Sequence, residues 1–379
     1  MGTAVALTIA EVAVRWIAPR PTELQSPGMY VPDVSVGYRL NPGHAGFLGN
    51  RVEYHTSVHV NSDGLRGEMT GPVDCRLRVL VIGDSFVFGQ GVEASDAFPA
   101  KLQAALRTRG IASQVMNAGV RGYGTAQEVA WLRTYGMMLS PDIVVMGVFL
   151  GNDIQDNMLA PAAHRAIPAE LARTSGKWWH NGLTQWLFGN SHLYVLLRDV
   201  PRHWKMHRTS IGRVDVAYLS KTYPAAAVTE DTEAMRRTAT AVEEFARMTR
   251  EAGVEQLAVL IPDALQVGPW RSDLAKELAG KGIRLDFDYP RRIFTDLFAG
   301  HGVAVLDLSG TLRDSVAGGK VLYYPVDGHW TPLGHDVAAS TVADFVQAGV
   351  QVRSLLDRAG RGPVAGGLWR SSPCAGGPS

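Results

Sequence analysis

The chain has 379 residues, which is long enough for one large domain or two ordinary ones. Hydrophobic residues make up 46% of it, as in a globular core, and the formal net charge is only +1. No basic stripe with interleaved aromatic residues occurs, so the composition excludes nucleic acid as the expected partner. The two cysteines, Cys75 and Cys374, form neither a disulfide framework nor a zinc pattern.

An apolar segment opens the chain. The stretch "AVALTIAEVAVRWIAP" carries only two charges, Glu11 and Arg15, which are four residues apart and can pair on one face of a helix. It is too short and too charged for a confident membrane span, and it lacks the basic start of a signal peptide. Three interpretations stay open: an amphipathic helix, a weak anchor, or the end of an anchor whose first turns precede this chain. We expect a helix within residues 1–20, with residues 1–19 as the candidate for membrane association.

Residues 21–75 predict a β-rich extension. They are rich in Pro and Gly and contain the alternating run "VEYHTSVHVNSDG". Alternate residues of this run, mostly apolar, would lie on one side of an extended chain, which predicts a β-strand followed by a turn at residues 61–64. The members of that side are Val52, Tyr54, Thr56, Val58 and Val60.

A different pattern covers residues 76–349, where apolar strand-like runs alternate with helical periodicity. Such alternation predicts a parallel sheet covered by helices on both faces. We therefore expect a three-layer α/β/α domain with a flavodoxin-like, five-stranded parallel sheet. Residues 157–225, dense in Trp and Leu, interrupt this pattern and predict a helical insert. Helices packed on the core are the commonest explanation, and a substrate lid or a membrane-facing surface are the alternatives. Residues 350–379 predict a disordered tail because they are rich in Gly, Pro and Ser.

Polar residues follow several of the predicted strands. "VLVI" runs into Gly83-Asp84-Ser85, a second strand ends at "NAGVRGYG", and a third ends at "GND". The segment "VDGHWTPLGH", residues 326–335, follows the last strand. Because ligands bind beyond the carboxyl ends of the strands in an open parallel sheet, one site could gather all four segments.

These residues suit nucleophilic acyl chemistry. A serine hydroxyl is a weak nucleophile and needs a base, so Ser85 is paired with His329, and Asp327 can fix the imidazole tautomer. The negative oxygen of the transition state needs donors. The backbone N–H groups of Ser85 and Gly122 and the side-chain amide of Asn152 are the candidates.

The sequence resembles the GDSL-type, or SGNH, hydrolases. Their four blocks correspond here to "GDSF" at Ser85, "NAGVRG" at Gly122, "GND" at Asn152 and "DGHWTPLG" at His329. The resemblance covers residues 76–349 and implies their fold, a Ser-His-Asp triad, an oxyanion hole and no cofactor or metal. "VGYRLNP" and "VNSDGLRG" also resemble bacterial membrane-anchored members of unassigned substrate, which favours an anchor role for residues 1–19.

One departure from the family pattern concerns the acid. Many members place it three residues before the histidine, a position that Val326 occupies here. Asp327 stands two before His329, as in the SGNH proteins of alginate O-acetylation. This spacing leaves acyl transfer to or from a sugar open beside hydrolysis.

Other motif residues have simpler interpretations. We expect Asp84 and Asp153 to bond local backbone N–H groups and His335 to be a helix-surface or capping residue. The pair His203 and His207 has no evident third ligand, so no metal site is expected. Gly89 and Gly91 lack the Lys-Ser/Thr of a phosphate loop, so nucleotide binding is rejected.

The sequence thus predicts a serine-dependent acyl-ester hydrolase. The alternatives are an O-acyltransferase acting on an envelope polysaccharide and a catalytically idle, glycan-binding SGNH module. The expected partners are an acylated small molecule, glycan or lipid ester, and the expected location is extracytoplasmic, membrane-associated or periplasmic, with the cytoplasm not excluded.

Overall fold

A computed structural model describes residues 2–17, 24–68, 77–157, 187, 190–197, 207–209, 212–225 and 233–358. Its centre is a five-stranded parallel sheet with the strand order β12-β11-β8-β6-β7. Read from the other edge, this is the flavodoxin order, so the predicted fold class is confirmed. The strands are β6 (Leu77–Gly83), β7 (Ser113–Gly119), β8 (Ile143–Phe149), β11 (Glu255–Ile261) and β12 (Ala304–Asp307).

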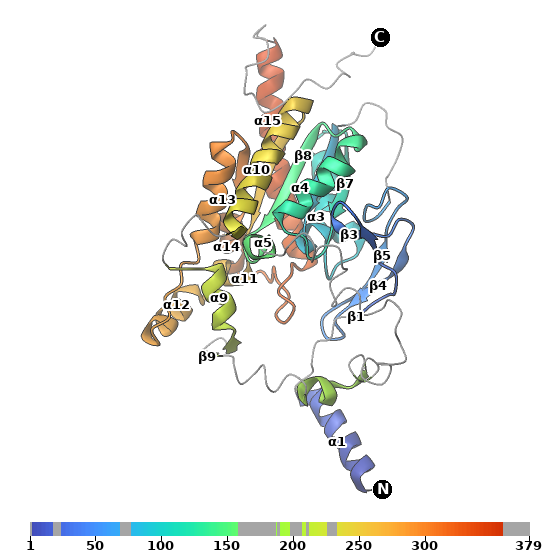
Figure 1. The fold of residues 1–379 in the computed structure, drawn as a ribbon, viewed down its shortest axis with the longest axis vertical. Coiled ribbons are helices and arrows are strands. Elements are labelled where there is room, and N and C mark those ends of the chain that lie inside the picture. Colours follow the sequence, from blue (N-terminus) through green and yellow to red (C-terminus); the bar gives the residue numbers. More distant parts are fainter. Residues whose placement is uncertain are drawn as a thin grey trace.

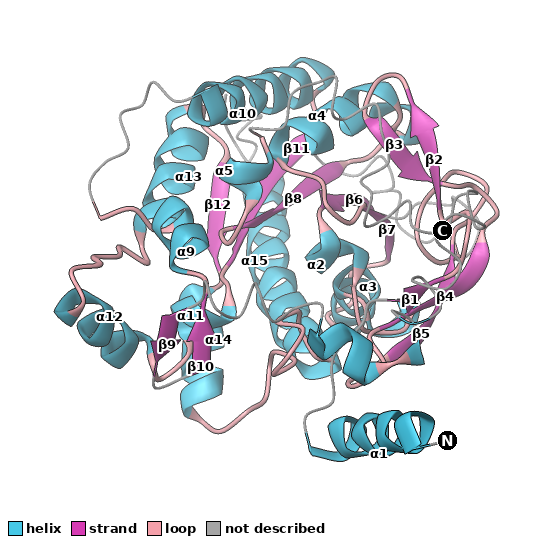
Figure 2. Cartoon of the chain, turned by 60° about the horizontal axis from the view of Figure 1, so that its bottom comes forward, coloured by secondary structure: helices cyan, strands magenta, loops and turns pink. Residues whose placement is uncertain are grey.

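Helices cover both faces of this sheet, as Figures 1 and 2 show. Alternate strand residues point to opposite faces, so Leu80 and Ile82 belong to one core and Val79 and Val81 to the other. The first core is closed by α4 (Thr125–Thr134), α10 (Glu233–Ala252) and α13 (Tyr289–Gly300). The second is closed by α3 (Phe98–Thr108), α14 (Ser309–Ala317) and α15 (Pro332–Arg358).

Helix α15 differs from the expected boundary. It continues to Arg358, beyond residue 349, at which the sequence pattern ended the domain. The predicted disordered tail therefore cannot begin at residue 350. Residues 359–379 lie outside the described residues.

The N-terminal extension is β-rich, as predicted, and its strands form two small antiparallel sheets (Figure 1). One contains β1 (Leu24–Gln25), β4 (Ala45–Gly49) and β5 (His55–His59); the other pairs β2 (Tyr30–Asp33) with β3 (Gly37–Leu40). Tyr54, Thr56, Val58 and Val60 are all buried on one side, but Val52 lies before the strand and is 36% exposed. The predicted alternation therefore starts later than the sequence indicated.

The insert is described only in part. Residues 192–197 are helical, β9 (His207–Thr209) and β10 (Gly212–Val214) form a hairpin, and α9 (Val216–Thr222) follows. The described part is therefore not wholly helical, because it includes this hairpin. Most of the Trp-rich stretch lies outside the described residues.

Helix α1 (Gly2–Ile17) buries none of its residues. Glu11 accepts hydrogen bonds from Arg15 at 2.6 Å and from the backbone N–H groups of His192 and Leu193, each at 2.9 Å. Glu11 thus caps the helical residues 192–197, beside which α1 lies in Figure 1. Within the described part of the chain, no helix combines the length and the apolar character that a membrane span requires.

Candidate active site

Ser85 is the first residue of α2 (Ser85–Phe88), a single helical turn that follows β6. The Asp84 carboxylate accepts from the Phe86 N–H at 2.9 Å and so caps this turn. Ser85 therefore stands at the carboxyl edge of the sheet, in the loop of β6, which lies between β7 and β8. This is the point at which the strand order reverses, where open α/β sheets bind ligands.

A row of three glycines lets α2 lie this close to the sheet. Gly83 pairs in register with Gly119 on β7 and with Gly147 on β8. A Cβ at Gly119 would stand 2.1 Å from the backbone nitrogen of Phe88, and a Cβ at Gly147 would stand 2.5 Å from the Val87 side chain. The short helix occupies the space that three side chains would otherwise fill.

Hydrogen bonds join the three residues predicted to act together. The Ser85 Oγ lies 2.7 Å from His329 Nε2, and His329 Nδ1 lies 2.5 Å from Asp327 Oδ1. An Nδ1–H donated to Asp327 leaves the Nε2 lone pair facing the serine. The imidazole also packs on the ring of Phe86, with centroids 4.9 Å apart, and the next residue, Trp330, is fully buried.

Asp327 is ionised although it is mostly buried. Its second oxygen, Oδ2, accepts from the Tyr54 hydroxyl at 2.9 Å and from Gln90 Nε2 at 3.2 Å. Burial is the largest influence and would raise the pKa of Asp327, but hydrogen bonds with His329, Tyr54 and Gln90 outweigh it and lower the pKa to about 2. The carboxylate is therefore charged over the whole neutral range.

Gly122 and Asn152 lie on the loops that follow the two strands beside β6. Gly122 has a φ of 77°, a conformation that favours glycine. Asn152 precedes the short helix α5 (Asp153–Asp156) but makes no capping hydrogen bond, so its side chain is not committed to that helix. Their position around the β6 loop is the one predicted, and their role as oxyanion donors stays a prediction.

Buried carboxyl groups lie behind these loops. Asp84, Glu128 and Asp153 are each 1% exposed, and both oxygens of Glu128 lack a hydrogen-bond partner among the described residues. Burial, together with the charges of neighbouring carboxylates, raises the pKa of Glu128 and Asp153 well above the usual values. Burial raises the pKa of Asp84 to about 6 and that of Asp156 to about 7. The carboxyls of this group cannot all be ionised at neutral pH.

Asp84 and Asp153 bond local backbone N–H groups, as predicted, and His335 is a capping residue rather than a helix-surface residue. Asp84 accepts from the Phe86 N–H, and Asp153 accepts from the Phe149 N–H at 3.0 Å. His335 accepts from the Phe98 N–H at 3.1 Å and so caps α3, but it is fully buried rather than on a helix surface. Burial lowers the pKa of His335 to about 3, so it is neutral.

The histidine pair cannot be judged, because His203 and the side chain of His207 lie outside the described residues. Within the described ranges, no group of three or more His, Cys, Asp or Glu side chains is arranged to hold a metal ion. The phosphate-loop glycines, Gly89 and Gly91, have a structural use here. Both adopt a φ of 88°, Gly89 ending α2 and Gly91 packing against Tyr54 and Tyr324.

A family model matches the C-terminal part of this arrangement. Residues 220–361 match the SGNH hydrolase-like domain of the acetyltransferase AlgX. This part of the chain therefore resembles an SGNH hydrolase-like domain. The match agrees with the prediction of an ester-acting enzyme of the SGNH/GDSL type. The matched residues include Asp327 and His329, whereas Ser85, Gly122 and Asn152 precede them.

Solved structures that resemble this chain have low sequence identity to it. A search of curated proteins found no match. TesA is 16% identical over 72% of this chain and 98% of its own, with a TM-score of 0.40. A lipolytic protein of the G-D-S-L family from Desulfitobacterium hafniense DCB-2 is 12% identical over 71% and 99%, with a TM-score of 0.38. A catalytic mutant of an acetylxylan esterase from Geobacillus stearothermophilus is 10% identical over 73% and 95%, with a TM-score of 0.39. With values this low, we carry no property of these proteins over to this chain.

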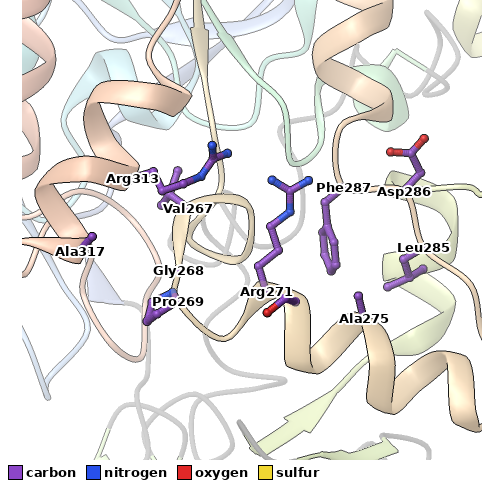
Figure 3. A pocket seen from close by; sticks show the side chains of 11 residues that line it. Val267, Gly268, Pro269, Arg271, Ala275, Leu285, Asp286, Phe287, Arg313 and Ala317 are labelled. Atoms are coloured by element: carbon purple, nitrogen blue, oxygen red, sulfur yellow. The ribbon is translucent and has the colours of Figure 1, made fainter.

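The region that matches the family model also contains a cavity of about 590 Å³ beyond the end of β11. Figure 3 shows Arg271, from α12 (Arg271–Gly280), and Arg313, from α14, on different walls of it. Arg271 is held by Asp288 at 2.5 Å. The cavity lies on the same edge of the sheet as Ser85, but its lining includes none of the predicted site residues.

Sequence reasoning missed the partners of Asp327. Tyr54 and Glu53 come from the β-rich extension, and Gln90 follows the nucleophile block. No local motif identifies them. The available signals were the position of Tyr54 on the predicted buried side of its segment and the nearness of Gln90 to Ser85 in sequence.

Proposed function

We propose that this protein is a serine-dependent acyl-ester hydrolase of the esterase or deacetylase type. The observation that carries the proposal is the hydrogen-bonded series from Ser85 through His329 to Asp327. Ser85 and His329 are 244 positions apart in sequence, yet their reactive atoms lie 2.7 Å apart at the strand-order reversal. A buried, ionised acid, an oriented imidazole and a half-buried serine hydroxyl are what general-base activation of a serine requires.

The first chemical step follows from this geometry. The Ser85 oxygen forms a bond to the acyl carbon while its proton passes to His329 Nε2. The ionised Asp327 stabilises the imidazolium that results. The carbon–oxygen bond to the alcohol then breaks, and His329 returns the proton to the departing oxygen. The product is an acyl-serine and a free alcohol.

The second step regenerates the serine. A water molecule loses a proton to His329 as its oxygen attacks the acyl carbon, and the bond to Ser85 breaks as that proton is returned. In both steps the negative charge on the carbonyl oxygen would be held by the N–H groups of Ser85 and Gly122 and by the Asn152 amide. Each such donor typically contributes about 10²–10³ in rate.

A fluorophosphonate probe tests for an activated serine. We expect covalent labelling of the full chain at Ser85, located by mass spectrometry, and no label at that position in the Ser85→Ala variant. Labelling of His329→Ala should be slower by roughly 10³-fold or more, because the proton acceptor is gone. Ser85→Ala should keep its fold, since the half-buried hydroxyl fills no core space. A folded wild-type protein that takes no label would contradict the proposal.

O-acyl transfer to an envelope polysaccharide is the second candidate. It is favoured by the two-residue spacing of Asp327 and His329 and by the match of residues 220–361 to a domain described for an acetyltransferase. The first step is the same, but a sugar hydroxyl takes the place of water in the second. Incubation with p-nitrophenyl acetate and envelope oligosaccharides distinguishes the two: an acetyl mass gain on the sugar supports transfer, and free acetate alone supports hydrolysis.

An idle, glycan-binding module is the remaining alternative. It predicts no serine labelling and glycan binding that Ser85→Ala leaves unchanged. The substrate class we propose is an acylated small molecule, glycan or lipid ester. The exposed apolar residues of α1 support membrane association. An extracytoplasmic or periplasmic location is part of the proposal and rests on the sequence resemblance.

A further inference from the structure

We propose that the β-rich extension is part of the catalytic centre and that Tyr54 is a positioning residue for the reaction. Together with Gln90, the Tyr54 hydroxyl holds the carboxylate of Asp327 in line with His329. The inference rests on the proposed serine chemistry, and it adds a role for a segment that lies outside the four sequence blocks.

The contacts of Asp327 show how its orientation is fixed. One carboxylate oxygen faces His329 Nδ1 at 2.5 Å, and the other accepts from both Tyr54 and Gln90. Gln90 Nε2 also donates to the Tyr54 hydroxyl at 3.1 Å, so the three groups form a closed triangle. Rotation of the carboxylate away from His329 would break both donor bonds at once.

The rest of the network leaves the triangle little freedom. The side-chain oxygen of Gln90, Oε1, accepts a hydrogen bond from Arg121 Nε at 2.6 Å. The exposed fractions of Gln90 and Arg121 are only 5% and 4%. Glu53, beside Tyr54 in sequence, accepts the backbone N–H groups of Val326 and Asp327, each at 2.8 Å. Neighbouring residues of the extension therefore bind both the backbone and the side chain of Asp327.

The extension also holds the nucleophile helix. The Arg66 guanidinium is buried and donates to the carbonyl oxygens of Phe88, Gly89 and Val92 at 2.5–2.6 Å. The Phe88 and Gly89 carbonyls lie at the carboxyl end of α2, one turn after Ser85, where a cation is favoured, and Val92 lies in the loop beyond it. Both the serine and the acid of the proposed triad are thus fixed by residues 53–66.

Removal of the Tyr54 hydroxyl has a definable consequence. Phenylalanine fills the same space in this buried position, so packing is kept and only the donor is lost. Burial acts to raise the pKa of Asp327, and the Tyr54 hydrogen bond is among those that lower it, so the pKa rises when the donor is removed. A carboxylate that is less firmly held, and that protonates more readily in acid, supports His329 less well.

The experiment compares Tyr54→Phe with Tyr135→Phe in the full-length protein. Tyr135 is the matched control, because its hydroxyl also donates to a carboxylate of the extension, Asp33, outside the described catalytic contacts. The readouts are kcat and KM for p-nitrophenyl acetate and the rate of fluorophosphonate labelling at Ser85, each between pH 4.5 and pH 9, with thermal unfolding as the check on folding.

We expect Tyr54→Phe to lower kcat and the labelling rate roughly tenfold at neutral pH, with KM within about twofold, as for a lost hydrogen bond to a charged group. The deficit should persist across this pH range, because Asp327 stays ionised above pH 4.5 even when the loss of one hydrogen bond raises its pKa from about 2. Tyr135→Phe should lower only the melting temperature. A folded Tyr54→Phe protein that labels at the wild-type rate across this range overturns the inference and leaves the proposed function standing. A wild-type chain without labelling overturns both.

Discussion

Carboxyl groups at the Ser85 site differ in charge because their hydrogen-bond partners differ. Asp327 accepts from a histidine, a tyrosine and a glutamine, and these bonds keep it ionised despite burial. Burial raises the pKa values of Asp84, Glu128 and Asp156, and neighbouring carboxylates add to this effect at Glu128 and Asp156. One short region of the molecule therefore keeps an ionised acid beside the histidine and, behind the serine, a group of acids that cannot all ionise at neutral pH.

The raised pKa of Asp156 should make the free energy of unfolding depend on pH. Burial and the charge of Asp84 raise its pKa from 3.8 to about 7 in the folded chain. A carboxyl with a raised folded pKa stabilises the fold fully below the unfolded value, and this stabilisation is lost as pH rises through the folded value. Stability conferred by Asp156 should thus fall between about pH 4 and pH 7.

We therefore expect Asp156→Asn, which cannot ionise, to be more stable than the wild type at pH 8 by on the order of 2 kcal/mol. The two proteins should be nearly equal at pH 4.5. Urea unfolding at both pH values measures the difference, with Asp314→Asn as an exposed control on α14. Equal stability of the variant and the wild type at pH 8 would show that Asp156 is not held neutral.

At the scale of the elements, α2 depends on the glycine row beneath it. The helix has only four residues, so it cannot be stable by itself and must be held by its surroundings. Asp84 caps its start, Arg66 binds its end, and Gly83, Gly119 and Gly147 allow it to approach the sheet. The orientation of Ser85 is decided by these contacts rather than by helix propensity.

Gly119→Ala tests this dependence. The added Cβ would meet the Phe88 backbone nitrogen at 2.1 Å, and a backbone atom cannot move aside without displacing α2. We expect a loss of about 2–3 kcal/mol in the free energy of unfolding, as for overpacking of a core, and at least tenfold slower labelling of Ser85. Gly310→Ala, where nothing lies within 4 Å of the new Cβ, should be neutral or slightly stabilising. Unchanged stability of Gly119→Ala in chemical unfolding would refute the role of the row.

At the scale of the whole molecule, α1 stands out because it exposes apolar side chains that do not pack against the folded domain. Its exposed large apolar residues are Val5, Leu7, Ile9, Val12, Trp16 and Ile17, with Trp16 85% exposed. An exposed apolar helix of this length is suited to lie in a membrane interface, where its side chains leave water. Glu11 joins α1 to residues 191–193 of the insert by hydrogen bonds. A membrane bound by α1 would therefore lie next to this part of the insert.

We expect the full chain to co-sediment with phospholipid vesicles through α1. Replacement of Ile9 and Ile17 by Gln should reduce the bound fraction at least fivefold, since burial of each side chain contributes about 1.5–3 kcal/mol. The variant should hydrolyse p-nitrophenyl acetate at the wild-type rate, because α1 is separate from the Ser85 site. Equal sedimentation of the two proteins would exclude α1 as the attachment surface.

The sequence alone determined the parallel sheet and the positions at which its strands end. Apolar runs and helical periodicity are local patterns, and a parallel sheet brings all carboxyl ends to one edge. The sequence therefore predicts Ser85, Gly122, Asn152 and the pair Asp327 and His329 at one edge of the sheet. The pairing of Asp327 with His329 could also be predicted, because the two residues lie two positions apart in one loop.

Only the tertiary structure decided which residues surround Ser85, His329 and Asp327. Tyr54 meets Asp327 across 273 positions of sequence, and this contact depends on how the extension packs against β7 and against the segments that follow β6 and β7. The burial of His335 and the proximity of Asp84, Glu128 and Asp156 are likewise properties of packed neighbours. Hydrophobic patterning fixes which face of an element is inside, but which buried polar groups meet there is set when separate elements pack together.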